Sequence, residues 1–587
     1  MLNDNTTSKR PSQLSRALFF IHKLPASDRL LFHILLAIVV TSGLVFTAIL
    51  SLERSQTVPS HDGVLHEGMI GAVRFINPIL ASTRVDRDLS ALVYQGVLRV
   101  DVNGELIPDL AQSVEISDSG TEYRIVLRQD QVFHDGRPVT ARDVVFTYKL
   151  AQAPELVSPQ RGNWGNVIVE QIDTFEVQLT LSEPYYPFQE NLTLGILPAH
   201  IWEAVPASEI LFSTRNTSPI GSGPYSIIEV QRNDEGTINQ VTLAAHDSAK
   251  KPIRTIVATI YTESATLQAD LDANLIDTTA ALNYNDAKQL NAAHYIINKI
   301  PLPRVVGLIY NQNRSPALRN SHVREALELA IGRQAILDAI PTETGIPTDT
   351  PIPAGYSMLN LKATSSPQAP TSTASTSAAI ARLEAGNWEQ TDDGVWVQET
   401  DDGSIPLELT IRTLDQPNFS AAAAAVASAW ESIGVVVLVE EFEQRDLVES
   451  IIRTRDFEIL LFGMDVTRSV DLYPFWHSSQ QSDPGQNIAQ YANISVDGYL
   501  QTLRTNTEHD RRLEAQENFI ATIKEERPAL FLYTPSSVLI SKRDLSLTIP
   551  KRVQTISDRW SSIGTWYNQT ENIWPWLQSH IQNNNPE

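Results

Sequence analysis

The chain has 587 residues, of which 42% are hydrophobic and 19% charged, and its formal net charge is −24. A chain of this length exceeds the size at which one core keeps growing, so we expect at least two lobes. The acidity argues against nucleic-acid binding, which needs a basic footprint. The absence of cysteine excludes disulfides, thiolate catalysis, cysteine-based zinc sites and lipid attached to an N-terminal cysteine.

An apolar segment without Asp, Glu, Lys or Arg extends over residues 31–52. As a helix it is long enough to cross a hydrocarbon core of about 30 Å. Residues 1–30 carry a net charge of +3, and basic flanks stay on the cytoplasmic side. We therefore expect a cytoplasmic tail at 1–30, an uncleaved transmembrane anchor at 31–52, a polar linker at 53–62 and an extracytoplasmic body. A cleavable signal peptide is the alternative, but such peptides usually have a shorter basic region and a shorter apolar core.

The stretch from Gly120 to Leu150 predicts a strand, a turn and a capped helix. Asp135-Gly136 supplies the turn, because glycine tolerates positive φ and aspartate bonds its own backbone. Thr140 and Asp143 have the spacing of a capping box at the start of the helix. Alternate apolar positions of the first half predict a strand with one buried face: Tyr123, Ile125 and Leu127. His134 lies alone in the turn, and we interpret it as structural rather than as a metal ligand or a catalytic group.

Further strands and helices follow in alternation, which is typical of α/β proteins. Periodicity predicts two strands within 167–181, strands at 305–310, 435–440, 457–462 and 529–533, and helices beginning at 320 or 321, at 421–432 and at 511–528. Residues 362–379 are rich in Ser, Thr and Ala. Such a segment buries too little apolar surface to offset its ordering, so we expect a disordered surface insertion there.

The order of these residues resembles the family 5 extracellular solute-binding proteins, the peptide- and nickel-binding subunits of ABC importers. The resemblance covers about Gly63 to Trp576 in colinear order with one insertion. The segments that carry it include Phe133-His134-Asp135-Gly136, Pro184-Tyr185-Tyr186-Pro187-Phe188 and Pro219-Ile220-Gly221-Ser222-Gly223-Pro224-Tyr225. The glycines of the third segment lack the further signals of a phosphate-binding loop. We expect a chain reversal there, where backbones cross between lobes.

The resemblance implies a two-lobe periplasmic-binding-protein fold of type II, in the large cluster that has an extra subdomain. Lobe I is expected at 63–305 with the extra subdomain at about 100–218, lobe II at 306–540, and a return to lobe I at 541–587. Chain crossings between the lobes would form a hinge that closes on ligand. An ABC transporter permease would then recognise the closed state.

The leading functional prediction is capture of an extracellular peptide in the cleft between the lobes. Asp465 follows the predicted strand at 457–462, and ligands of open α/β sheets bind beyond the carboxyl ends of strands. In peptide-binding relatives an Asp in the corresponding loop pairs with the ligand's α-ammonium group, and Asp471 lies close by. We expect Asp465→Ala to weaken peptide binding more than about tenfold. The other ligand-binding candidates are Asn77, Tyr185, Tyr186, Asn311 and Trp476.

The sequence leaves three alternatives open. A nickel or other metal-chelate binding protein is disfavoured by the absence of cysteine and the sparse histidines. A membrane-tethered peptide sensor or chaperone without a transporter has the same sequence features. An enzyme is disfavoured, because the sequence contains no Gly-x-Ser-x-Gly or His-Glu-x-x-His motif. We predict no catalytic residues, no metal site and no cofactor.

Overall fold

The computed structural model describes residues 25–54, 56–60, 62–246, 251–342, 344–358, 374–400 and 403–573. The chain divides into two compact units, one made of residues 1–60 and 570–587 and the other of residues 61–569.

The first unit contains one long helix and a pair of short strands. Helix α2 (Ala26–Arg54) includes a stretch, Ser27–Thr47, that is long and apolar enough to cross a membrane. Strand β1 (Gln56–Pro59) pairs antiparallel with β23 (Thr570–Ile573). The expected linker at 53–62 is therefore partly regular structure. The backbone groups of an extended segment need partners, and 570–573 supplies them to 56–59.

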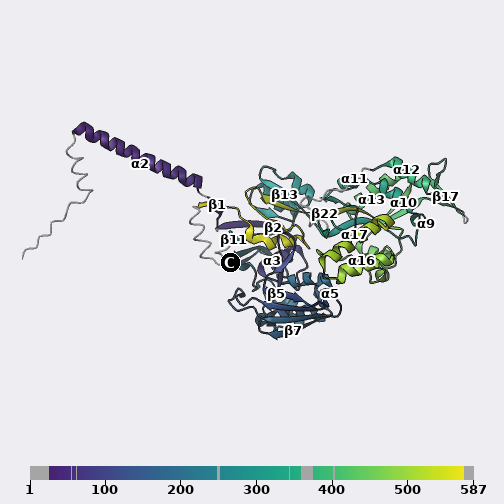
Figure 1. Ribbon diagram of the computed structural model, residues 1–587, viewed down its shortest axis with the longest axis horizontal. Helices are drawn as coiled ribbons and strands as arrows, with labels where there is room; N and C mark the ends of the chain where they lie inside the picture. Colours follow the sequence, from purple (N-terminus) through teal and green to yellow (C-terminus); the bar gives the residue numbers. More distant parts are fainter. Residues whose placement is uncertain are drawn as a thin grey trace, which may run out of the picture. The chain divides into compact units, whose positions relative to one another are not determined.

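The second unit contains a large mixed sheet (Figure 1). Among the described residues it has 12 strands, in the order β20-β19-β21-β14-β22-β12-β2-β11-β10-β9, with β13 and β15 also paired to β22. The strands are β2 (Gly63–Ile70), β9 (Tyr225–Arg232), β10 (Ile238–Ala245), β11 (Ile253–Tyr261), β12 (Thr278–Thr279), β13 (Tyr295–Pro301), β14 (Arg304–Tyr310), β15 (Thr344–Pro347), β19 (Glu408–Leu414), β20 (Val436–Phe442), β21 (Ile459–Asp465) and β22 (Ala529–Lys542).

Two antiparallel chain segments pass from one half of this sheet to the other. The first is β13 followed by β14, separated by Leu302 and Pro303, and the second is β22. The amino-terminal part of β22 pairs with β14, and its carboxyl-terminal part, from Ser536 on, pairs with β13. The amide of Leu302 donates to the carbonyl of Pro535 at 2.9 Å between the crossings. The chain therefore returns to the first half near Pro535, inside β22, and not at the expected boundary at 540. The return lies inside a strand because β22 is long enough to pair in both halves.

A separate four-stranded sheet has the order β5-β6-β8-β7 within the described residues. Its strands are β5 (Ala111–Ile116), β6 (Glu122–Leu127), β7 (Val167–Asp173) and β8 (Glu176–Leu181). Helix α4 (Ala141–Gln152) follows β6 and begins with a capping box of Thr140 and Asp143. The predicted strand, turn and capped helix are all present. Tyr123, Ile125 and Leu127 are buried in one core with Val144 and Tyr148 of the helix.

The glycine segment at 219–225 approaches another part of the backbone closely, as its glycines predict. The backbone that it approaches is the end of a helix and not a crossing between lobes. A Cβ on Gly221 would lie 2.0 Å from the carbonyl oxygen of Val93, and the Gly223 amide donates to that oxygen at 2.8 Å. Val93 ends helix α3 (Arg84–Val93), which belongs to the same core as β6 and α4. The expected crossing between lobes is therefore wrong, because this contact is made inside the first lobe.

The helices of the second half surround two further cores. The longer ones are α10 (Ser321–Leu329), α12 (Thr376–Ala385), α13 (Pro417–Glu431), α16 (Ile494–Thr505) and α17 (His509–Glu526). We expected a disordered insertion at 362–379, and this expectation is wrong for its last residues, from Ser375 to Ala379. Ser375 caps α12 by accepting from the Ala378 amide, and Ala379 is buried. Residues 362–373 lie outside the described residues.

The chain ends its second unit with η9 (Ile556–Thr565), whose Trp560, together with Trp566, is buried in the core that holds α3. The remaining helices are α5 (Arg161–Trp164), α6 (Ala199–Trp202), α7 (Ser264–Asp272), α8 (Tyr284–Gln289), α9 (Pro316–Arg319), α11 (Arg333–Ala339), α14 (Gln444–Asp446), α15 (Tyr473–Trp476), η1 (Pro154–Leu156), η2 (Tyr186–Thr193), η3 (Ala207–Phe212), η4 (Thr214–Asn216), η7 (Leu447–Ile452) and η8 (Ser478–Gln480). The remaining strands are β3 (Leu98–Val100), β4 (Leu106–Pro108), β16 (Glu389–Gln390), β17 (Trp396–Thr400) and β18 (Gly403–Pro406).

Candidate functional site

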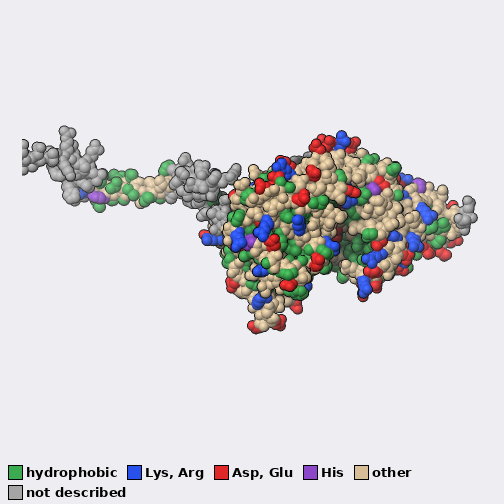
Figure 2. All heavy atoms as spheres, turned by 90° about the horizontal axis from the view of Figure 1, so that it is seen from below, with side chains coloured by type: hydrophobic (Ala, Val, Ile, Leu, Met, Phe, Trp, Pro, Cys, Tyr) green, Lys and Arg blue, Asp and Glu red, His purple; other side chains and the backbone are tan. Residues whose placement is uncertain are grey.

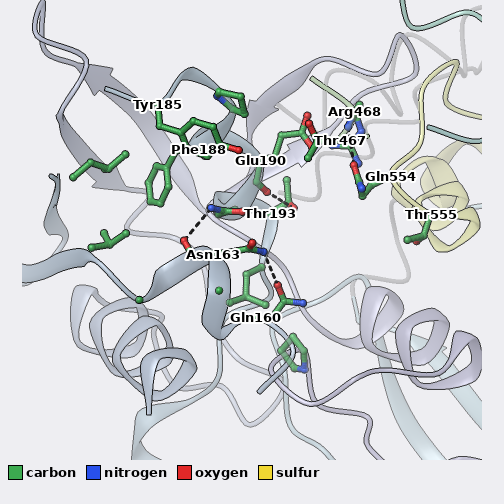
Figure 3. Close-up of a pocket in the computed structure, with 18 of the residues that line it drawn as sticks. Gln160, Asn163, Tyr185, Phe188, Glu190, Thr193, Thr467, Arg468, Gln554 and Thr555 are labelled. Carbon is green, nitrogen blue, oxygen red and sulfur yellow. Dashed lines mark hydrogen bonds between the residues drawn. The ribbon is translucent and has the colours of Figure 1, made fainter. Parts of the chain in front are cut away.

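A cleft of about 710 Å³ lies between the two halves of the second unit. Its lining comes from three parts of the chain: residues 78–195, residues 467–505 and residues 554–558. Figure 3 shows Arg468, Thr467 and Gln554 at one end of the cavity and Tyr185 and Phe188 at the other. On the face seen in Figure 2 the surface is hollowed near the middle of the body, and acidic and basic side chains are interspersed.

One wall of the cleft joins Tyr185 to the loop after β21. The Tyr185 hydroxyl donates to Oδ2 of Asp471 at 3.0 Å. The guanidinium of Arg504, from α16, lies 4.9 Å from the Tyr185 ring centroid and 4.3 Å from that of Tyr473. It also forms an ion pair with Asp471 at 3.7 Å. Aromatic faces and a carboxylate therefore hold this arginine at the cleft.

A second wall is built around Arg468 from the same loop. Its Nη2 donates to Oδ2 of Asp558 at 2.7 Å, and its backbone amide donates to Oε1 of Gln554 at 2.7 Å. Asp558 completes a capping box with Thr555 at the start of η9. Glu190 faces the same loop and is hydrogen-bonded to Ser469. The loop at 467–471 therefore contacts both the η2 region and the return segment.

The carboxyl groups at these walls are shielded from water. Burial raises the pKa of Asp471, against the opposing effects of Arg504 and the Tyr185 hydroxyl. Burial likewise raises the pKa of Glu190, although Arg468 and Ser469 favour its ionised form. Burial also raises the pKa of the Tyr185 phenol, and Asp471 adds to the effect. A phenol that stays protonated can donate to Asp471 throughout the physiological pH range.

The cleft presents charges of both signs. Its charged lining residues among the described part of the chain are Arg87, Arg468, Arg504, Glu183, Glu190 and Asp558. Such a lining suits a polar ligand that carries both positive and negative groups. In the described ranges, the structure contains no cluster of three or more His, Asp or Glu side chains that could hold a metal ion.

Asp465 lies away from this cleft. It is the last residue of β21, and its carboxylate pairs with Arg304 on the neighbouring strand, at 2.6 Å to Nε and 2.8 Å to Nη2. It lines a smaller cavity of about 370 Å³, which Trp476 also lines. The strand continues to Asp465, three residues beyond its predicted end, so this carboxylate takes part in a cross-strand ion pair rather than lying on a loop.

The other sequence candidates divide between the cleft and the interior. Tyr185 lines the cleft, whereas Tyr186 turns away and stacks under Arg512, at 3.4 Å from the guanidinium carbon to the ring centroid. Asn77 is buried, and its amide donates to Asn216 at 3.1 Å. Asn311 is buried and donates to the Arg455 carbonyl at 2.9 Å. Trp476 is buried in a core of the second half.

His134 has the structural role that its isolation predicts. Its Nδ1 accepts from the Gly221 amide at 3.3 Å, and its Nε2 donates to the Gly223 carbonyl at 3.0 Å. Burial lowers the pKa of His134 to about 4. The neutral imidazole, with its proton on Nε2, satisfies both contacts, so this residue fixes the glycine segment rather than contacting the cleft.

The charged residues of the cleft that sequence reasoning missed are Arg87, Glu183, Glu190, Arg468, Arg504 and Asp558. Among these, only Arg468 could have been proposed from the sequence. Like Asp471, it follows the predicted strand at 457–462, and this position is the reason that Asp465 was chosen. Nothing in the local pattern indicates which of Asp465, Arg468 and Asp471 faces the other half of the molecule.

The fold and this cleft agree with what the chain resembles. The family model of the bacterial extracellular solute-binding proteins, family 5, matches residues 105–486. The chain belongs to this family. Family 5 proteins are the solute-binding subunits of ABC importers.

Two known proteins illustrate the relationship. This family 5 chain is 25% identical over 507 residues to the oligopeptide-binding protein AppA of Bacillus subtilis (strain 168), covering 84% of the chain and 90% of AppA. AppA solved in complex with a nonapeptide has a TM-score of 0.58 at 23% identity, covering 87% of this chain and 99% of that one. NikZ from Campylobacter jejuni, in complex with Ni(L-His), has a TM-score of 0.60 at 23% identity, covering 87% and 100%. These likenesses confirm the predicted two-lobe fold.

Proposed function

We propose that this family 5 protein captures peptides outside the cytoplasm and presents them to an ABC transporter permease. The observation that carries the proposal is the cleft itself, which both halves of the second unit line with arginines and carboxylates together. A peptide backbone brings an ammonium group, a carboxylate and many amides, and such a wall can pair with all three. The relatedness to the oligopeptide-binding protein AppA supports a peptide rather than a metal chelate. On this proposal the protein binds its ligand without turning it over.

The loop at 467–471 gives the cleft a means to close on ligand. It reaches across to Tyr185, Glu190 and Asp558, while the crossings at Leu302 and Pro535 join the two halves. A ligand that contacts both sides stabilises the closed arrangement by its differential affinity for that state.

The first test uses full-length protein extracted in detergent. Native mass spectrometry followed by denaturation identifies what the purified protein carries, and calorimetry measures the affinity for that ligand. Short peptides are the expected result. A nickel chelate or a single non-peptide solute would replace the peptide proposal. Hydrolysis of a bound peptide would contradict the proposal of a pure binding protein.

Tyr185→Ala is expected to weaken peptide binding at least about tenfold, or about 1.4 kcal/mol. The change removes an aromatic surface of the cleft and the hydrogen bond to Asp471 that links the two halves. Tyr186→Ala is the matched control, because the neighbouring ring also contacts the other half, through Arg512, but does not line the cleft. Calorimetric affinities of the two variants should differ, with Tyr186→Ala within about twofold of the unaltered protein. Equal losses in both variants would remove Tyr185 from the site.

We further propose that α2 remains attached and anchors the protein in the membrane, with the amino terminus inside and the body outside. The Thr41 and Thr47 hydroxyls donate to the carbonyls of Ala37 and Gly43, at 2.6 Å and 2.9 Å, so these polar groups are satisfied within the helix. Hydrogen bonds of this kind, made within the helix, suit a bilayer core that offers no water.

The anchor proposal predicts that the protein from its native membrane retains its amino-terminal residues. It should resist extraction by alkaline carbonate and dissolve in detergent, and its intact mass should include the helix. A variant lacking residues 1–54 should be recovered in the soluble fraction. A mature amino terminus between Ser51 and His66 would show instead that the segment is a cleaved signal peptide.

A further inference from the structure

The cleft adjoins a second cavity of about 1000 Å³. Six residues contribute to the lining of both: Ala91, Tyr94, Thr193, Arg468, Ser557 and Asp558. The two spaces therefore share a wall, and this shared wall holds the guanidinium of Arg468. A ligand that fills the cleft can reach this wall.

The shared wall contains buried polar atoms that have no hydrogen-bond partner among the described residues. They are the Tyr94 hydroxyl, the Ser557 hydroxyl, and Nε and Nη1 of Arg468. The Arg468 side chain is only 6% exposed. Nε1 of Trp560, which lines the second cavity, also lacks a partner in the described part of the chain. Leaving such groups unpaired costs about 1–3 kcal/mol each, and more for a charged group, so a bound molecule is expected to satisfy them.

These atoms are mostly donors. The guanidinium of arginine and the indole N–H of tryptophan only donate, whereas hydroxyl groups both donate and accept. The matching partner is therefore an acceptor, and a carboxylate is the acceptor that a guanidinium binds best. Arg468 is also held in place for such a contact, because Asp558 and Gln554 fix its Nη2 and its backbone amide.

The two acids near Arg468 are also bonded to other groups, and they leave its Nε and Nη1 without a hydrogen-bond partner among the described residues. Asp558 is already engaged, since the amides of Gln554 and Thr555 donate to it as well as Arg468. Glu190 is the other acid that faces Arg468; it is hydrogen-bonded to Ser469, and burial raises its pKa.

We propose that Arg468 determines specificity by binding a carboxylate of the ligand at the wall shared by the two cavities. This inference rests on the proposed function, because it names the part of the peptide that this wall takes. The carboxylate comes from the carboxyl terminus of a peptide or from an acidic side chain, and the experiment separates the two sources.

The test compares three sets of alanine-based tri- to pentapeptides with full-length protein in detergent: free acids, carboxyl-terminal amides, and amides with one glutamate. Unaltered protein should bind the free acids at least about tenfold more tightly than the plain amides. If the glutamate-containing amides regain this affinity, the side-chain carboxylate is the bound group. In Arg468→Met the preference for acid over amide should fall to within about twofold.

Arg504→Met is the comparison variant, because Arg504 is a second arginine of the cleft and its side chain is 31% exposed. It should keep the ratio of acid to amide affinity, whatever its overall affinity. Equal binding of acids and amides by the unaltered protein would overturn the inference and leave peptide binding intact, and this arm needs no variant to fold. Loss of the preference in Arg504→Met alone would assign the carboxylate to Arg504. If none of the three sets binds, the proposed function fails, and this inference with it.

Discussion

Gly223→Ala is expected to destabilise the protein by at least about 3 kcal/mol, at the upper end of overpacking effects. A Cβ at this position would lie 2.3 Å from the carbonyl carbon and 2.5 Å from the carbonyl oxygen of Val93. Both are backbone atoms at the end of α3, so no side-chain rotation relieves the overlap. The shift would also break the bond from the Gly223 amide to the Val93 carbonyl and the contact from His134 to the Gly223 carbonyl.

Denaturant unfolding of the full-length protein measures this effect, and Gly498→Ala is the control. Gly498 lies exposed inside helix α16, and a Cβ there would meet no atom within 4 Å. That substitution should stabilise by up to about 1 kcal/mol through helix propensity. If Gly223→Ala unfolds within about 1 kcal/mol of the unaltered protein, the close approach to α3 is not a constraint on the fold.

Arg559→Met is expected to destabilise the protein by about 3–5 kcal/mol, the usual cost of removing one partner of a buried ion pair. Arg559 is fully buried and donates to both oxygens of Asp88, at 2.8 Å and 2.9 Å, and to Glu67 at 2.8 Å. These groups come from η9, α3 and β2, so the network connects the return segment to the first core. Without the guanidinium, the buried Asp88 loses its ion-pair partner and Glu67 loses a hydrogen-bond donor.

The stability of a triple variant separates charge from packing. Adding Glu67→Gln and Asp88→Asn to Arg559→Met should recover part of the lost stability, because the neutral amides no longer carry unpaired charge. A loss of the same size in the triple variant would assign the effect to packing of the arginine stem.

Glu67 also gives this network a pH dependence. Burial raises the pKa of Glu67 to about 8; Arg559 opposes this shift and the neighbouring Asp88 adds to it. Between its ordinary value, about 4.3, and this raised value, the folded state holds a proton that the unfolded chain releases. Its contribution to stability is therefore fully present at low pH and is lost as the pH rises through about 8. Glu67→Gln should flatten this part of the stability profile between pH 5 and 9.

Local structure followed from the sequence where neighbouring residues carry the information. The capping box of Thr140 and Asp143 and the buried alternation of Tyr123, Ile125 and Leu127 depend only on contacts within a few residues. The helix of residues 26–54 could be predicted because the apolar segment at 31–52, as a helix, is longer than a membrane core is thick. The helix begins at Ala26, before the predicted residue 31, because the residues just before the apolar segment are also compatible with a helix. The charged residues that bound the apolar segment do not mark where the helix ends.

The residues of the site could be identified only from the tertiary structure. Asp465 and Arg468 lie on the same short segment after a strand, and the alternation of the sequence does not show how far the strand extends. In the fold the strand runs through Asp465, where Arg304 on the adjacent strand takes the carboxylate, and the chain then turns so that Arg468 meets Asp558. The decisive partners are distant in sequence.

The family, the helix near the amino terminus and the local elements can all be predicted from the amino-acid order, because each depends on short-range pattern and composition. Which charged residues meet at the cleft depends on contacts that form only in the folded protein. Tyr185 and Asp471 are 286 residues apart and touch because two chain crossings bring the halves of the sheet together. Burial then shifts the pKa of Asp471 and Glu190, and the degree of burial depends on both halves packing around them.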